Sequence, residues 1–170
     1  PPELPDDEYA VIYADPPWQY DHQEAPNREI ENHYGTMSLS DICGLDIPAA
    51  NDAVLYMWTT APKLREAFDV IDSWGFEYVT GAVWDKQKIG MGYWFRGQHE
   101  HLLVAKRGGI SPPDTGARQS SVISEERGKH SSKPNHVYDL IEAAFPDRDR
   151  LELFARESRE GWDSWGDEIE

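Results

Sequence analysis

Short apolar runs separated by polar or glycine-rich segments set the pattern of this 170-residue chain. Apolar runs predict strands at residues 9–14, 53–58, 78–84, 100–106 and 151–155, and the first two runs predict buried strands. Capping residues and apolar positions at helical spacing predict helices at residues 38–43, 62–75 and 134–145. Strands that alternate with helices are typical of a wound α/β sheet.

The polar segments between these elements predict the loops. Residues 1–8 form a polar leader, and we expect three long loops on the substrate side, at residues 19–33, 85–99 and 107–132. The last of them has no hydrophobic periodicity, and a loop of that length in a compact domain is usually functional or disordered. Because the chain shows no internal repeat and no linker, we expect one domain over residues 1–170.

Composition narrows the class of protein. No apolar run approaches the roughly 20 residues that cross a bilayer, and the start of the chain has no signal-peptide pattern. The single cysteine, Cys43, excludes a disulfide framework and a cysteine-rich metal site. His99 and His101 share one face of a predicted strand, but no third ligand follows at a useful spacing, so we expect no metal centre. These features favour a cytoplasmic protein.

The charge of the chain is unevenly distributed. Its net charge is −16, which argues against contact with nucleic acid because phosphates are bound by Lys and Arg. Residues 86–133, however, hold nine basic and four acidic residues, a net charge of +5. A solvated loop would explain this charge equally well as a nucleic-acid-binding surface. The candidate contacts in the second interpretation are Lys86, Lys88, Arg96, Arg118, Arg127 and Lys129.

The strongest chemical signal is Asp15-Pro16-Pro17-Trp18, which directly follows the first apolar run. In an open α/β sheet, ligands bind at the carboxyl ends of the strands. A carboxylate accepts a hydrogen bond from an exocyclic amine, prolines bring no competing N–H donor, and an indole can stack on a base. The tetrad therefore suits a flat base that carries an amine. A turn followed by a core tryptophan is the alternative interpretation.

Five segments of the chain follow one another in the order of a known enzyme family. They are Asp15–Trp18, Asn32–Met37, His130–Pro134, Leu151–Arg156, and Gly161-Trp162 with Gly166. With these motifs the chain resembles the DPPW-type adenine-N6 methyltransferases, the family of the catalytic subunit of the eukaryotic mRNA adenosine-N6 methyltransferase and its bacterial and phage relatives. The resemblance spans about residues 9–169.

The resemblance implies a permuted Rossmann-like methyltransferase fold, with a mostly parallel sheet, helices on both faces and S-adenosylmethionine as the cofactor. It implies that Lys133 serves the amino-acid end of the cofactor, that Arg156 lies on its ribose side, and that Asp15 is also a cofactor contact. A helix-start charge and a surface ion pair are the alternatives for the two cations. The tail departs from the family, which commonly has Asn and a second polar residue where this chain has the candidate cofactor contacts Asp167 and Glu168.

The resemblance also implies the chemistry. Asp15 and the carbonyl of Pro16 would take the two amine hydrogens of adenine and free the nitrogen lone pair for attack on the methyl group. Pro17 completes the catalytic tetrad, Trp18 would stack on the base, and Tyr34 would close the pocket around it. A target base inside a duplex must first be flipped out of the stack.

We therefore expect an S-adenosylmethionine-dependent adenine-N6 methyltransferase that acts on nucleic acid. The compact length resembles prokaryotic or phage members, which favours DNA as the substrate, with RNA as the second candidate. A non-catalytic nucleic-acid-binding partner that keeps the fold is the alternative from another class, and an enzyme for a small-molecule amine is a third. Assembly with a second copy or with a different chain stays open.

Overall fold

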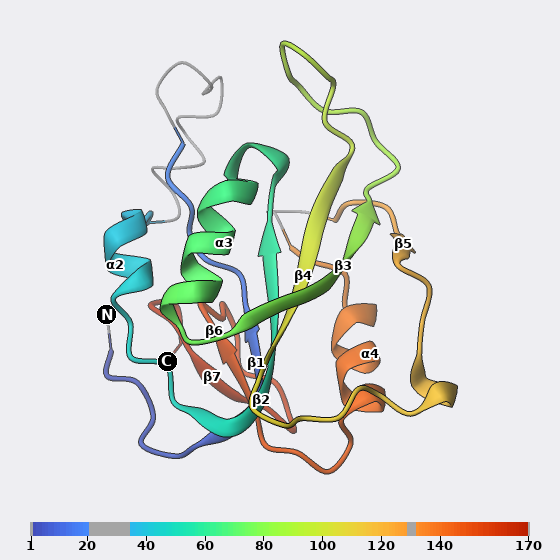
Figure 1. The fold of residues 1–170 in the computed structure, drawn as a ribbon. Helices are drawn as coiled ribbons and strands as arrows, with labels where there is room; N and C mark the ends of the chain where they lie inside the picture. Colours follow the sequence, from blue (N-terminus) through green and yellow to red (C-terminus); the bar gives the residue numbers. More distant parts are fainter. Residues whose placement is uncertain (1, 21–34, 129–131, 170) are drawn as a thin grey trace.

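The computed structural model describes residues 2–20, 35–128 and 132–169. Within these ranges the chain forms a seven-stranded sheet in the order β5-β3-β4-β2-β1-β6-β7 (Figure 1). The strands are β1 (Tyr9–Ala14), β2 (Ala49–Thr59), β3 (Glu77–Asp85), β4 (His99–Arg107), β5 (Val122–Ser124), β6 (Arg150–Leu153) and β7 (Asp163–Trp165). The helices are α2 (Leu39–Cys43), α3 (Leu64–Ser73) and α4 (His136–Ala144), with 3-10 turns at Ala61–Lys63 and Thr115–Ala117.

One strand, β4, runs in the opposite direction to the rest of the sheet. It pairs antiparallel with β2 and β3, whereas the other neighbouring strands pair parallel. The carboxyl ends of six strands and the amino end of β4 therefore meet at one edge, which we call the carboxyl edge. The prediction of a mostly parallel, wound α/β sheet is confirmed.

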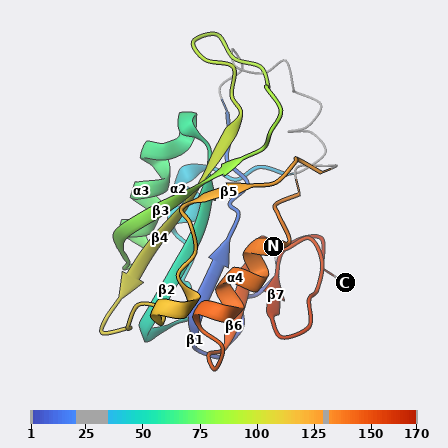
Figure 2. The same cartoon turned by 90° about the vertical axis from the view of Figure 1, so that its right-hand side faces the viewer.

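Helices cover both faces of the sheet, as predicted (Figures 1 and 2). The apolar sides of α2 and α3 pack on one face, where Ile42 and Ile71 are buried. α4 packs on the opposite face, where Val137 and Ile141 are buried. All six residues of β1 are buried because successive side chains enter alternate cores, which explains why its sequence lacks polar positions.

Local signals account for the helix ends. The hydroxyl group of Ser38 accepts a hydrogen bond from the Asp41 N–H (3.1 Å) and caps α2, which decides between Ser38 and Ser40, the two caps that the sequence allows. After α3, Gly75 has a φ of +81°, a left-handed conformation that glycine adopts at little cost. None of the helices in the described ranges is long and apolar enough to cross a bilayer.

The structure adds two short strands, β5 and β7, that the sequence does not predict. Each has three residues, too few for an alternating pattern to show, and pairing with β3 and β6 stabilises them. The predicted loop 107–132 is therefore a connection between opposite edges. It begins at the amino end of β2, where the Gly109 N–H donates to Asp52 Oδ1 (2.7 Å), and reaches the carboxyl edge through β5.

Candidate active site

The tetrad Asp15–Trp18 follows β1 at the carboxyl edge, where backbone hydrogen bonds hold it. The Trp18 N–H donates to the carbonyl of Pro16 (2.9 Å), and the Met37 N–H donates to the carbonyl of Pro17 (3.0 Å). The two prolines have no N–H of their own to offer a neighbour. Because a carbonyl oxygen accepts two hydrogen bonds, the Pro16 oxygen retains a lone pair for a ligand.

Trp18, the last residue of the tetrad, lies in the core of the protein and not on its surface. Only 8% of the residue is exposed, and its indole N–H donates to the Trp58 carbonyl (3.2 Å). Within the described residues, Trp18 thus matches the core-tryptophan interpretation of the tetrad. Stacking on a base requires an uncovered face of the Trp18 ring, so this role of Trp18 stays a prediction.

Four charged side chains gather beside the tetrad and form what we call the charge cluster: Asp15, Lys86, Glu100 and Lys133. Lys133 Nζ lies 2.8 Å from Glu100 Oε1 and 3.7 Å from Asp15 Oδ2, and Lys86 Nζ lies 3.2 Å from Glu100 Oε2. These residues come from the ends of β1 and β3, the start of β4 and the segment before α4. Asp15 is the most open member, with 31% of its side chain exposed against 12% for Glu100.

Aromatic rings form the wall behind the charge cluster. Lys133 Nζ lies 5.6 Å from the ring centroid of Trp58, and Lys86 Nζ lies 5.8 Å from that of Trp84. The Trp58 indole N–H in turn donates to the hydroxyl of Tyr13 (2.6 Å). The negative faces of the indoles attract the two ammonium groups, and the low local polarity strengthens the ion pairs in front of them.

Burial and mutual attraction shift the pKa values within the charge cluster. Burial raises the pKa of Asp15, and the positive charge of Lys133 offsets only part of that effect. Burial would also raise the pKa of Glu100, but Lys133 and Lys86 outweigh it and hold that pKa below its ordinary value. Burial would lower the pKa of Lys133, but Asp15 and Glu100 outweigh it and raise that pKa. The cluster therefore joins a firmly ionised Glu100–Lys133 pair to an Asp15 that binds a proton more readily than an ordinary aspartate.

A further carboxylate, Glu152 on β6, packs against α4. The Tyr138 hydroxyl of α4 lies 2.8 and 2.7 Å from its two oxygens. Burial raises the pKa of Glu152 to about 7, the bond from Tyr138 opposes this shift, and the charge of Asp15 adds to it. The sequence does not single out Glu152 or Glu100, although a signal exists. Each is an acid inside an apolar strand, where an unpaired charge would be costly.

The ends of β6 and β7 pack directly against each other at the carboxyl edge. The Ala155 N–H donates to the Trp165 carbonyl (2.9 Å), and Gly166 packs so closely on the Ala155 backbone that a Cβ atom would collide with it. Three of the predicted cofactor contacts follow these strand ends: Arg156 after β6, and Asp167 and Glu168 after β7. Arg156 is near enough for its charge to lower the pKa of Asp15, against the larger effect of burial.

The structure groups most of the described basic candidates near the β3–β4 connection. Lys86 belongs to the charge cluster, and the Arg127 N–H donates to the Lys86 carbonyl (3.2 Å), which brings Arg127 beside it. Lys88 pairs with an exposed glutamate at 2.7 Å, and Arg96 is exposed. These four basic residues therefore lie around one loop at the carboxyl edge, with Lys86 and Lys88 in ion pairs.

Arg118 lies elsewhere. It follows the Thr115–Ala117 turn, which packs beside α4 toward the amino ends of the parallel strands (Figures 1 and 2). Its Nε donates to the Pro113 carbonyl (3.1 Å). The structure does not bring Arg118 to the tetrad, because the connection after β4 leaves from the opposite edge of the sheet. Two other predicted site residues, Tyr34 and Lys129, lie outside the described residues.

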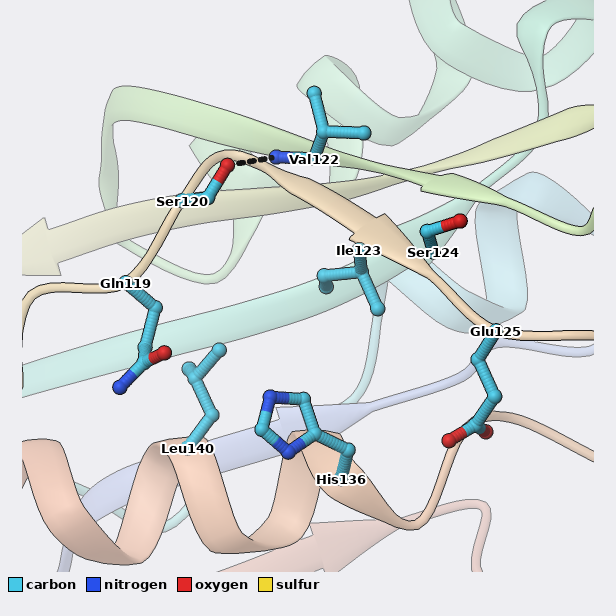
Figure 3. A pocket seen from close by; sticks show the side chains of 8 residues that line it. All are labelled: Gln119, Ser120, Val122, Ile123, Ser124, Glu125, His136 and Leu140. Atoms are coloured by element: carbon cyan, nitrogen blue, oxygen red, sulfur yellow. Dashed lines mark hydrogen bonds between the residues drawn. The ribbon is translucent and has the colours of Figure 1, made fainter.

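Two surface pockets lie apart from the charge cluster. One, of about 190 Å³, opens between β5 and α4, and Ile123 and Leu140 point into it (Figure 3). The other lies at the amino ends of β1 and β6. Neither is lined by a predicted site residue. Across the described parts of the chain, no group of three His, Cys, Asp or Glu side chains could hold a metal ion.

The topology and the tetrad at the carboxyl edge define the class of Rossmann-like methyltransferases. The profile of the MT-A70 family matches residues 9–168, nearly the whole chain. The chain therefore belongs to the MT-A70 family, which confirms the resemblance in its sequence and the enzyme class that the resemblance implied.

Relatives of this chain come from bacteria and from eukaryotes. The type II methyltransferase M.MunI of a Mycoplasma species is 41% identical over 99% of this chain and 81% of its own length. An MT-A70-like N(6)-adenosine-methyltransferase of Drosophila melanogaster is 32% identical over 87% of this chain. The human N(6)-adenosine-methyltransferase catalytic subunit METTL3 is 31% identical over the same share. The chain spans about a quarter of the length of the two animal proteins.

Proposed function

We propose that this chain transfers the methyl group of S-adenosylmethionine to the N6 amine of adenine in DNA. The observation that carries the proposal is the partly open Asp15 carboxylate, held beside the Pro16 carbonyl and paired with a buried Lys133 at the carboxyl edge. Relatives named as N(6)-adenosine-methyltransferases support adenine as the target, and the type II methyltransferase relative supports DNA. RNA is the second candidate substrate, supported by the relatives named as adenosine methyltransferases.

In this mechanism the tetrad orients the amine. The Asp15 carboxylate and the remaining lone pair of the Pro16 carbonyl accept the two N6 hydrogens, so the nitrogen lone pair is turned away from both. Correct orientation of two reactants supplies up to roughly 7–11 kcal/mol of the barrier. As N6 gains the methyl group it releases one proton. The raised pKa of Asp15 suits that carboxylate to receive this proton before passing it to solvent.

The residues at the carboxyl edge fit S-adenosylmethionine by their donor chemistry. The ammonium group of Lys133 has three N–H donors, and the carboxylates of Glu100 and Asp15 leave one for the carboxylate of the cofactor. Arg156, Asp167 and Glu168 follow the adjacent ends of β6 and β7, which the close contact of Gly166 with the Ala155 backbone holds together, so their side chains would contact the cofactor from one side. When bound, S-adenosylmethionine supplies an activated methyl group on a positively charged sulfur.

The test is transfer of labelled methyl from S-adenosylmethionine to DNA and RNA that lack methylation, each single- and double-stranded, followed by digestion and analysis for N6-methyladenine. We expect label in DNA. The Asp15→Ala variant should lose at least about a thousandfold in rate, as expected when orientation and a charge-matched acceptor are both removed, and should still bind the cofactor in calorimetry.

Three results would contradict the proposal in different ways. Label in RNA alone would make RNA the substrate. Cofactor binding without transfer to any nucleic acid would favour the non-catalytic partner that keeps the fold. Full activity of Asp15→Ala would remove Asp15 from the mechanism.

A further inference from the structure

The connection between β3 and β4, residues 86–98, forms a projecting arm. The two strands are antiparallel neighbours, so their connection is a hairpin rather than a crossover. Its sides are joined by the Lys86 N–H to Gln98 carbonyl bond (2.9 Å) and the Gly90 N–H to Gly97 carbonyl bond (2.7 Å). In both views the arm rises beyond the carboxyl edge, past the end of the sheet (Figures 1 and 2).

The tip of the arm carries three aromatic side chains that face solvent. Tyr93, Trp94 and Phe95 are 90%, 97% and 90% exposed. Two more large apolar residues of the arm, Ile89 and Met91, are about 70% exposed. This exposure excludes a place for Trp94 in the core. An exposed apolar cluster of this size marks a surface that meets a partner.

The shape of the tip is set by tight turns. A Cβ atom on Gly92 would collide with the Phe95 carbonyl, and one on Gly90 would lie 2.7 Å from the Gly97 oxygen. Only glycine fits at these two positions, and the chain folds back closely on itself. The three aromatic rings therefore project from a tight, narrow turn.

The charge of the arm selects the kind of partner. Residues 86–98 contain Lys86, Lys88 and Arg96 and no acidic residue, in a chain whose net charge is −16. Lys86 and Lys88 form ion pairs with Glu100 and Glu126, which lie outside the arm. Arg127 is joined to the base of the arm by its backbone bond to Lys86. Positive charge at the sides and aromatic faces at the tip match the phosphates and stacked bases of nucleic acid.

We propose that the tip of the arm is a wedge that enters the base stack of duplex DNA and occupies the gap left by the flipped adenine. This inference rests on the proposed function, because it assigns the arm to the same substrate. The arm and the tetrad lie at one edge of the sheet, so a duplex held by the basic sides meets both. Aromatic stacking in the gap offsets the energy needed to unpair and unstack the target.

The experiment compares Trp94→Ala with the wild-type protein on one mapped methylation site in three forms. The forms are a paired duplex, the same duplex with a mismatch opposite the target adenine, and the single strand. We expect Trp94→Ala to lower the methylation rate about tenfold or more on the paired duplex and to leave the rate on the single strand unchanged. The mismatched duplex should recover most of the loss. Val122→Ala, a change at an exposed apolar residue off the arm, is the matched control.

A second readout is the fluorescence of 2-aminopurine in place of the target adenine, which rises when the base leaves the stack. The wild-type protein should raise it in the paired duplex, and Trp94→Ala should not. Equal rates for variant and wild type on all three forms would overturn the wedge and leave the proposed function intact. If Trp94→Ala lowers the methylation rate equally on all three forms and light scattering shows that its mass in solution differs from that of the wild-type protein, the tip is a contact between copies of the chain and not a wedge. Failure of the wild-type protein to methylate any form would overturn the proposed function itself.

Discussion

The charge cluster and the arm lie at the same edge of the sheet but differ in burial and pairing. In the charge cluster, Glu100 and Lys133 are largely buried, Asp15 is partly open, and the three are paired with one another beside indole rings. At the tip of the arm, Tyr93, Trp94 and Phe95 are almost fully exposed. Lys86 belongs to both regions. The proposed catalytic residues thus hold one another in place within the fold, whereas the aromatic tip faces solvent and, in our proposal, contacts the substrate.

Removal of the central cation should have the largest effect on this comparison. Lys133→Met leaves Glu100 and Asp15 without their main partner, and loss of one member of a buried pair costs about 3–5 kcal/mol of unfolding free energy. Because Lys133 lowers the pKa of Asp15, its loss should also move the acid limb of any residual activity to higher pH. Denaturant titration and a pH–rate profile measure the two effects. Lys106→Met, a change at an exposed lysine of β4, is the control. Equal losses of unfolding free energy in the two variants would show that Lys133 is no more important to the fold than an exposed lysine.

Neutralising the arm should have an intermediate effect, confined to binding. Lys88→Gln, Arg96→Gln and Arg127→Gln together should weaken DNA binding about tenfold or more. They should also reduce the slope of log binding constant against log salt concentration by roughly 2–3. The unfolding free energy should stay the same, because these side chains are exposed. Arg118→Gln is the matched control, since the structure places that arginine away from the carboxyl edge. An equal effect of Arg118→Gln would mean that overall charge, and not the arm, governs binding.

The smallest effect is expected at Glu152, on the buried side of the comparison. Its pKa is raised from 4.5 to about 7 in the folded protein, so the folded state holds this proton more tightly than the unfolded state between those values. Stability is therefore lost as the pH rises through that window. Glu152→Gln should be more stable than the wild-type protein by about 1 kcal/mol at pH 8, because it removes the cost of ionising Glu152, and no more stable at pH 4. The gain at pH 8 is smaller than the full cost that the pKa shift implies, because solvent screens the charge and the amide forms a weaker hydrogen bond to Tyr138. Thermal unfolding across pH measures it, and a gain that is the same at both pH values would contradict the assignment.

Much of the fold follows from the sequence because its central strands are buried on both faces. The run at Tyr9–Ala14 and the cap at Ser38 are found where the sequence predicts them. β5 and β7 escape prediction because three residues carry no pattern, and their stability comes from strands that lie far away in the sequence. Local sequence describes long elements well and edge strands poorly.

The candidate site is less accessible to sequence reasoning. Asp15 and Lys133 are singled out by their motifs, but Glu100, which pairs with Lys133, is not, because the strand order that brings β4 near β1 cannot be read from spacing. The same limit applies to Trp94. An aromatic run between glycines fits a core strand or an exposed turn equally well, and only the hairpin geometry separates the two.

The reversed direction of β4 has a consequence for how such an enzyme can change. Because β3 and β4 are joined at the carboxyl edge by a hairpin, the arm can be lengthened, shortened or exchanged without rerouting the chain through the sheet. A chimera that carries another sequence between Lys86 and His99 would keep the tetrad, the Lys86–Glu100 ion pair and the core on both faces. In the proposed mechanism, the reversed strand thus separates the arm, which would select the substrate, from the tetrad, which would modify it, so that the arm would be a replaceable module for target preference.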